Sequence, residues 1–120
     1  MKALLTPIFL LILMCSPVTW SADWDKGVTA YQNGDYATAL KEWTPLAEQG
    51  NAYAQFNLGL MYKYGDGVPQ DYSTAVKWYT LSAEQGNATA QSNLGLMYAN
   101  GNGVPQDYKT AVKWLKLSAE

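Results

Sequence analysis

The chain has 120 residues, 10 of them acidic and 8 of them lysine, with no arginine and a formal net charge of −2. This acidic balance argues against nucleic acid as a partner, because binding to a phosphate backbone needs clustered cationic side chains. The chain has no histidine and one cysteine, Cys15, so the side chains that most often act as general bases or zinc ligands are nearly absent. We therefore expect a protein that is not an enzyme and that needs no cofactor and no metal.

Residues 1–22 have the layout of a cleaved secretory signal peptide. A positively charged start precedes an apolar run, residues 3–14, and two small residues end at Ala22. The run is shorter than the roughly 20 apolar residues of a membrane anchor. We expect cleavage after Ala22 and a periplasmic or secreted product with no integral membrane segment. Acylation of Cys15 as a lipoprotein is disfavoured, because the bulky Met14 stands where a small residue is usual.

Cleavage at this point leaves one small domain, residues 23–120. Its 7 lysines and 10 acidic residues give a net charge of −3. Cys15 is removed with the signal, so the product contains no disulfide, although an oxidising compartment would permit one.

The mature part of the chain is a sequence repeat. Residues 35–70 and 71–106 are identical at 25 of 36 positions, and a partial third copy occupies residues 107–120. A period of this length is typical of a stacked array of small helical or mixed units. Residues 23–34 are interpreted as a preceding half-unit, a lone helix that covers the open end of the first copy.

Each unit is expected to contain two helices, because apolar and small residues recur at helical spacing. Gly95 falls in the middle of such a helix, where glycine costs about 1 kcal/mol relative to alanine, which suggests a close approach between two backbones. In residues 71–106 the side chains expected to face inward are Tyr72, Ala75, Val76, Tyr79 and Ala83 in the first helix, and Ala90, Leu94, Met97 and Tyr98 in the second.

The stretch YGDGVPQDY, residues 64–72, places glycines beside carboxylates and returns as NGNGVPQDY at 100–108. Gly65 is expected to end one helix, Pro69 to prevent its continuation, and Asp71 to cap the next. A calcium loop would need staggered carboxylates and a closing glutamate, which this stretch lacks. We interpret it as a connector between helices.

The stretch AVKWYTLSAEQGNATAQSNLGLMYANGNGVPQDY, residues 75–108, resembles the Sel1-like repeat, a relative of the tetratricopeptide repeat. The resemblance covers residues 35–120 and implies an all-α fold, a right-handed α-α solenoid of about 2.5 repeats. The matching positions are Ala75, Trp78, Tyr79, Ala83, Gly86, Ala90, Leu94, Gly95, Tyr98, Gly101, Gly103, Val104 and Asp107.

The resemblance also implies a function. Members of this family bind proteins or peptides on a concave surface, often as adaptors in bacterial envelope or host-interaction pathways, and most are not catalytic. One secreted, cysteine-rich branch has been described as binding or slowly cleaving penicillins, so a β-lactamase-like or penicillin-binding activity is the alternative. The absence of those cysteines counts against it. The first unit also departs from the pattern, because Glu42 and Trp43 replace the tryptophan–tyrosine pair.

Positions that differ between the units are the better candidates for partner binding, since packing between similar units should require the same residue in each. Tyr53 and Phe56 lie three residues apart and share a helical face, where an aromatic pair would form a peptide-binding hot spot. An equal alternative is that Phe56 packs against the N-terminal helix. The full candidate set is Tyr53, Phe56, Tyr64, Trp78 and Trp114.

The partial third unit should present an apolar stripe that is packed on one side only. The stripe contains Val112 and Leu115, and the opposite face carries Lys109, Lys113 and Lys116. Either this helix is the terminal cap of the array, or its open side docks a partner or a second copy of the chain. A small self-associating structural protein is therefore a third hypothesis.

Overall fold

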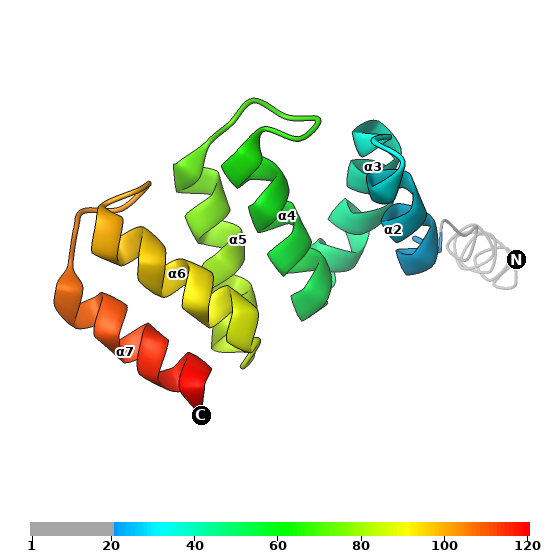
Figure 1. Ribbon diagram of the computed structural model, residues 1–120. Coiled ribbons are helices and arrows are strands. Elements are labelled where there is room, and N and C mark those ends of the chain that lie inside the picture. The colour runs from blue at the N-terminus through cyan, green and yellow to red at the C-terminus, as the bar shows by residue number, and fades with distance from the viewer. Residues whose placement is uncertain (1–20) are drawn as a thin grey trace, which may run out of the picture.

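The computed structural model describes residues 21–120, and this part of the chain is built from helices joined by short loops (Figure 1). The predicted signal peptide lies almost wholly outside the described residues. The helices are α2 (Trp24–Gln32), α3 (Tyr36–Glu48), α4 (Ala52–Tyr64), α5 (Tyr72–Glu84), α6 (Ala88–Asn100) and α7 (Tyr108–Ala119).

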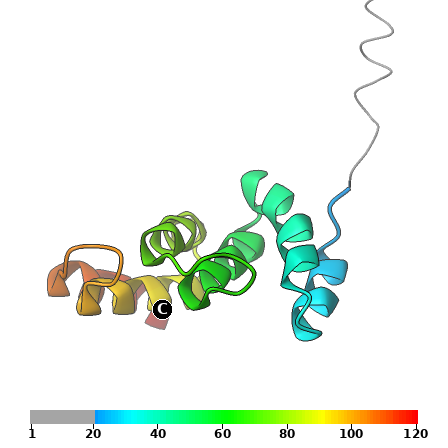
Figure 2. The same ribbon diagram turned by 90° about the horizontal axis from the view of Figure 1, so that it is seen from above.

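The helices stack in chain order. Each one packs on the next, from α2 on α3 to α6 on α7, so the described residues form a row of helices rather than a closed bundle (Figures 1 and 2). The predicted all-α fold of paired helices is confirmed. Within residues 21–120, no helix combines the length and the apolar character needed to cross a bilayer.

Helix ends follow the capping signals in the sequence. The carboxylate of Asp71 accepts hydrogen bonds from the Thr74 amide at 3.2 Å and the Thr74 hydroxyl at 2.7 Å, which satisfies donors that the helix itself leaves unpaired. Asn87 caps α6 in the same way through the Ala90 amide at 2.8 Å. Gly65 ends α4 with a φ of 73°, as the connector interpretation predicted.

Three of the caps are carboxylates and should make stability sensitive to acid. Hydrogen bonds from the residue three positions later lower the pKa of Asp35, Asp71 and Asp107 below the usual value. A lowered folded-state pKa contributes stability that is present above the unfolded pKa and is lost as the pH falls through the folded pKa.

We expect the triple variant Asp35→Asn, Asp71→Asn, Asp107→Asn to lose less stability than the wild type between pH 4 and pH 2, as measured by urea unfolding. Asparagine caps helices about as well as aspartate and does not titrate, and this chain already uses Asn51 and Asn87 as caps. The two proteins should therefore be similarly stable at pH 7. An identical acid dependence in both would contradict the prediction.

The core consists of two similar clusters in succession. The first contains Trp43 of α3 with Leu58 and Met61 of α4, and the second contains Tyr79 of α5 with Leu94 and Met97 of α6. Alanines fill the tight positions between the helices in both. The predicted inward positions Ala75, Val76, Tyr79, Ala83, Ala90, Leu94 and Met97 are all buried.

Tyr72 was expected to face inward, and this prediction is wrong: its side chain is 38% exposed. The residue is the first of α5, so its side chain lies at the N-terminal end of that helix, beside the loop that precedes it, and its hydroxyl lies 3.4 Å from the Gln70 amide nitrogen. Tyr98, also expected inward, is half-buried against the second core.

A glycine in each second helix receives a large side chain from the helix that follows. A Cβ at Gly59 would lie 2.5 Å from the Tyr79 ring, and one at Gly95 would lie 2.8 Å from Leu115 Cγ. Gly27 has the same relation to Trp43, at 2.3 Å. The close approach between backbones expected at Gly95 is confirmed, because a Cβ there would also lie 3.1 Å from the Ala111 carbonyl oxygen, whereas the neighbours of Gly59 and Gly27 are side chains.

The last helix is covered on one side only, as expected. Of its apolar stripe only Ala111 is buried, while Val112, Leu115 and Leu117 are exposed. The three lysines at positions 109, 113 and 116 are exposed as well.

Candidate functional site: an apolar pocket between α2, α3 and α4

A pocket of about 180 Å³ opens between the first three described helices. Pockets that hold small-molecule ligands usually measure about 300–1,000 Å³, so this one has room for a single large side chain. Its lining is mainly apolar. The lining residues are Val28, Tyr31 and Gln32 from α2, Trp43 from α3, and Asn57 and Leu60 from α4.

The aromatic walls of the pocket are held by neighbouring rings. The Trp43 ring lies 5.7 Å from that of Tyr31 and 5.6 Å from that of Trp24. The Tyr36 ring lies 5.1 Å from that of Tyr31. Such ring pairs add to the packing energy and restrict movement of each member.

Two hydrogen bonds fix the orientation of these rings. The Tyr31 hydroxyl donates to Asp66 Oδ2 at 2.8 Å, and the indole nitrogen of Trp43 donates to the carbonyl of Trp24 at 3.4 Å. Burial and then the bond to Asp66 raise the pKa of Tyr31 to about 12. The phenol therefore stays protonated and remains a donor to Asp66 at any physiological pH.

The rim carries two amide side chains, Gln32 and Asn57. Within residues 21–120 neither makes a side-chain hydrogen bond, whereas Asn93, the counterpart of Asn57 one unit later, donates to the Thr89 carbonyl at 2.9 Å and lies 3.5 Å from Lys63 Nζ. An amide can donate and accept at once. The Gln32 and Asn57 amides can therefore form hydrogen bonds with a ligand that carries both donors and acceptors, such as a peptide backbone.

The candidate residues from the sequence do not gather in this pocket. Tyr53 is 67% exposed, with its ring 6.3 Å from Trp24, beside the ring cluster. Phe56 is half-buried and lies 5.7 Å from Tyr79 of α5. The two rings thus approach different helices instead of forming a pair, and the alternative that Phe56 packs against the N-terminal helix is wrong.

The other three candidates are distributed along the array. Tyr64 is 60% exposed at the end of α4, with Lys63 Nζ 5.2 Å from its ring centroid. Trp78 packs against the first core and Trp114 against the second, both half-buried. Each of these two tryptophans therefore contributes packing to a core.

The positions named for the repeat framework lie where such roles require. Ala75, Tyr79, Ala83, Ala90 and Leu94 are buried. Asp107 caps α7. The glycines Gly86, Gly101 and Gly103 have φ values of 94°, 69° and 75°, in the left-handed region that favours glycine.

Sequence reasoning missed Val28, Asn57 and Leu60. It looked for function at positions that differ between units, but Asn57 and Leu60 recur as Asn93 and Leu96. What differs is the surroundings: Leu60 is half-buried, packs against the second core and lines the pocket with residues of α2, while Leu96 is 48% exposed. The loop after α2 is shorter than the loops that follow the second helix of each unit. This difference was the signal in the sequence that the first helix packs against the array in another way.

Paired helices that repeat at a 36-residue period, with two matching cores, define an α-helical repeat protein. More particularly, the chain belongs to the Sel1 repeat family, whose model matches residues 52–87 and 88–120. These spans begin at α4 and α6, so they join each second helix to the first helix of the following unit. The unit boundaries 35–70 and 71–106 remain a prediction.

Solved structures support the same assignment. The Sel1 repeat protein from Oxalobacter formigenes is 36% identical, with a TM-score of 0.77 over 81% of this chain. The protein c5321, a protective antigen present in uropathogenic Escherichia coli strains and displaying an SLR fold, is 42% identical, with a TM-score of 0.76 over 80% of this chain. The present chain covers 40% and 21% of those two chains. Comparison with curated proteins gives no match.

Proposed function

We propose that this Sel1 repeat protein is a non-enzymatic interaction module that binds an extended peptide segment of another protein. One apolar side chain of the segment enters the pocket between α2, α3 and α4. The observation that carries the proposal is the pocket itself, an apolar cavity with fixed aromatic walls and two free amides at its rim. We further propose that the protein acts in the periplasm or outside the cell, after removal of residues 1–22.

The chemistry of the site favours a peptide over other ligands. An apolar pocket of this size takes one anchor residue, and a buried anchor of this kind supplies most of the affinity in peptide recognition. Gln32 and Asn57 can pair with the N–H and C=O groups on either side of the anchor. The rigid rings reduce the ordering cost that binding would otherwise carry.

The proposal is tested by selecting peptides from a displayed library on the purified chain and measuring their affinity for two matched variants. Leu60→Gln places a polar group in the pocket wall, and Leu96→Gln makes the same change one unit later, outside it. We expect Leu60→Gln to weaken binding by about tenfold or more, which corresponds to about 1.4 kcal/mol, and Leu96→Gln to leave it nearly unchanged.

Circular dichroism of both variants checks that each remains folded. Selected peptides should share one large apolar residue. Equal loss of affinity in the two variants, or peptides with no common apolar residue, would contradict the proposal.

A further inference from the structure

Glu42 is a buried carboxylate at a position where the repeat pattern has tryptophan. The residue lies on α3 and is 8% exposed, and the next two units carry Trp78 and Trp114 at the same place. A buried carboxylate is costly unless charge and hydrogen bonds compensate it. Packing between units therefore does not account for this residue.

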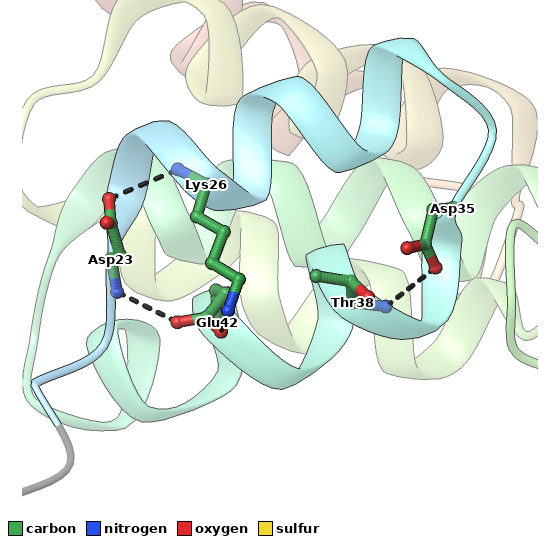
Figure 3. Close-up of polar contacts among 5 residues, drawn as sticks. All are labelled: Asp23, Lys26, Asp35, Thr38 and Glu42. Atoms are coloured by element: carbon green, nitrogen blue, oxygen red, sulfur yellow. Dashed lines mark hydrogen bonds and ion pairs between the residues drawn. The ribbon is translucent and has the colours of Figure 1, made fainter.

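Its partners both come from the start of α2 (Figure 3). Glu42 Oε1 accepts a hydrogen bond from the backbone nitrogen of Asp23 at 3.0 Å, and Oε2 lies 3.7 Å from Lys26 Nζ. The side chain of Asp23 is engaged elsewhere, since it caps α2 by accepting from the Lys26 amide at 3.1 Å. Of the two partners of Glu42, the main-chain nitrogen of Asp23 is thus the closer and is the one that donates a hydrogen bond.

This nitrogen is the one that the predicted cleavage would release. Ser21 and Ala22 line a cavity of about 230 Å³ together with Lys41, Glu42 and Pro45. Hydrolysis of the bond between Ala22 and Asp23 removes Ser21 and Ala22 from this cavity and leaves Asp23 in place, because Asp23 is held by its cap and by Glu42.

We propose that Glu42 is the binding site for the α-ammonium group of Asp23, formed when a signal peptidase hydrolyses the Ala22–Asp23 bond. Water adds across the peptide bond, so Ala22 leaves with the new carboxylate and the Asp23 nitrogen gains protons to become a cation. The neutral N–H donor facing Glu42 becomes an ammonium donor, so the hydrogen bond becomes an ion pair between two opposite charges. Cleavage of the signal peptide then strengthens the contact between α2 and α3.

This inference rests on the export cleavage proposed above, and it predicts a pH dependence. The charged groups around the ammonium are Glu42 and Lys41 on α3 with Lys26, Asp25 and the Asp23 carboxylate on α2. A free α-amino group has a pKa near 7.7–8.0, and a carboxylate at hydrogen-bond distance raises the pKa. When folding raises the pKa of a group, the stabilisation that results is complete at a pH below the pKa of the unfolded state. It is lost as the pH rises through the pKa of the folded state.

The test compares chains that begin at Asp23 and at Ser21. Both contain all the helices that build the two cores, and in the longer chain the Asp23 nitrogen stays an amide. We expect the pKa of the Asp23 α-amine, followed by its labelling rate against pH, to lie about 1 unit higher in the wild type than in Glu42→Gln. The thermal midpoint of the shorter chain should exceed that of the longer one at pH 6, and this excess should vanish above pH 9.5.

An unchanged α-amine pKa in Glu42→Gln, or the same pH dependence in both chains, would overturn the proposal. N-terminal sequencing of the exported full-length protein gives a separate result: a first residue other than Asp23 also overturns it. None of these measurements involves peptide binding, so their outcome is independent of the fate of the pocket proposal.

Discussion

Replacing Trp43 with alanine should lower the free energy of unfolding by about 3–5 kcal/mol. The side chain is 3% exposed, packs against the rings of Trp24 and Tyr31, and fills the space left by the missing side chain of Gly27. Truncation removes these contacts and leaves a cavity that rigid helices cannot close. Urea unfolding followed by circular dichroism measures the loss.

The effect of Trp43→Ala should be local, because each unit of a repeat array contacts only its neighbours. Amide hydrogen exchange should show reduced protection in α2 and α3, with α5 and α6 retaining theirs. Tyr53→Ala is the matched control, since it also removes an aromatic ring but from an exposed position, and it should cost less than about 1 kcal/mol. A loss below about 1 kcal/mol for Trp43→Ala would mean that the first core does not depend on this ring.

The second large effect is expected at Gly103, in the loop before α7. Its φ is 75°, and an added Cβ would lie 2.5 Å from both the carbonyl carbon and oxygen of Tyr72. Alanine in this region costs about 1–2 kcal/mol in strain, and the collision with backbone forces the loop away from α5 at a further cost of about 1–3 kcal/mol. We expect Gly103→Ala to lower stability by about 2–5 kcal/mol.

Gly86→Ala separates the two contributions. Gly86 has a φ of 94°, and nothing lies within 4 Å of its Cβ position, so only the conformational strain applies there. Urea unfolding of both variants should show a distinctly larger loss for Gly103→Ala. Equal losses of stability in the two variants would show that the loop moves without energetic cost and that its contact with Tyr72 adds no stability.

Most of the fold could be predicted from the sequence because local and repeated signals agree. The cap Asp71 occurs where the sequence predicted it, and the glycine of α6 marks a close contact between helices. These features depend on residues near each other in the chain, or on a position that returns in every unit. Tyr72 was misplaced because helical spacing alone does not show how far the neighbouring helices cover the first turn of a helix.

The candidate site was harder to predict because it forms at one junction only. The helix α2 has no counterpart with the same sequence in the array, so its angle to α3 and α4 follows from tertiary contacts such as Trp43 on Gly27 and Tyr31 on Asp66. Leu60 has the same neighbours in sequence as Leu96 yet lines a pocket. Comparing the units with each other therefore could not single it out.

The same limitation applies to Glu42. Its substitution for tryptophan was visible in the sequence, but its partner is a main-chain nitrogen, and no residue pattern identifies a backbone atom as the ligand. Only the geometry of α2 against α3 shows why a carboxylate stands there.

The central claim, that the pocket between α2, α3 and α4 receives the partner, is tested most directly by methyl and indole NMR shift mapping with a selected peptide. The account predicts the largest changes at Val28, Leu60 and the Trp43 indole, with small changes at Leu96. Changes concentrated instead at Val112 and Leu117 of α7 would contradict it and place the binding surface on the open end of the array.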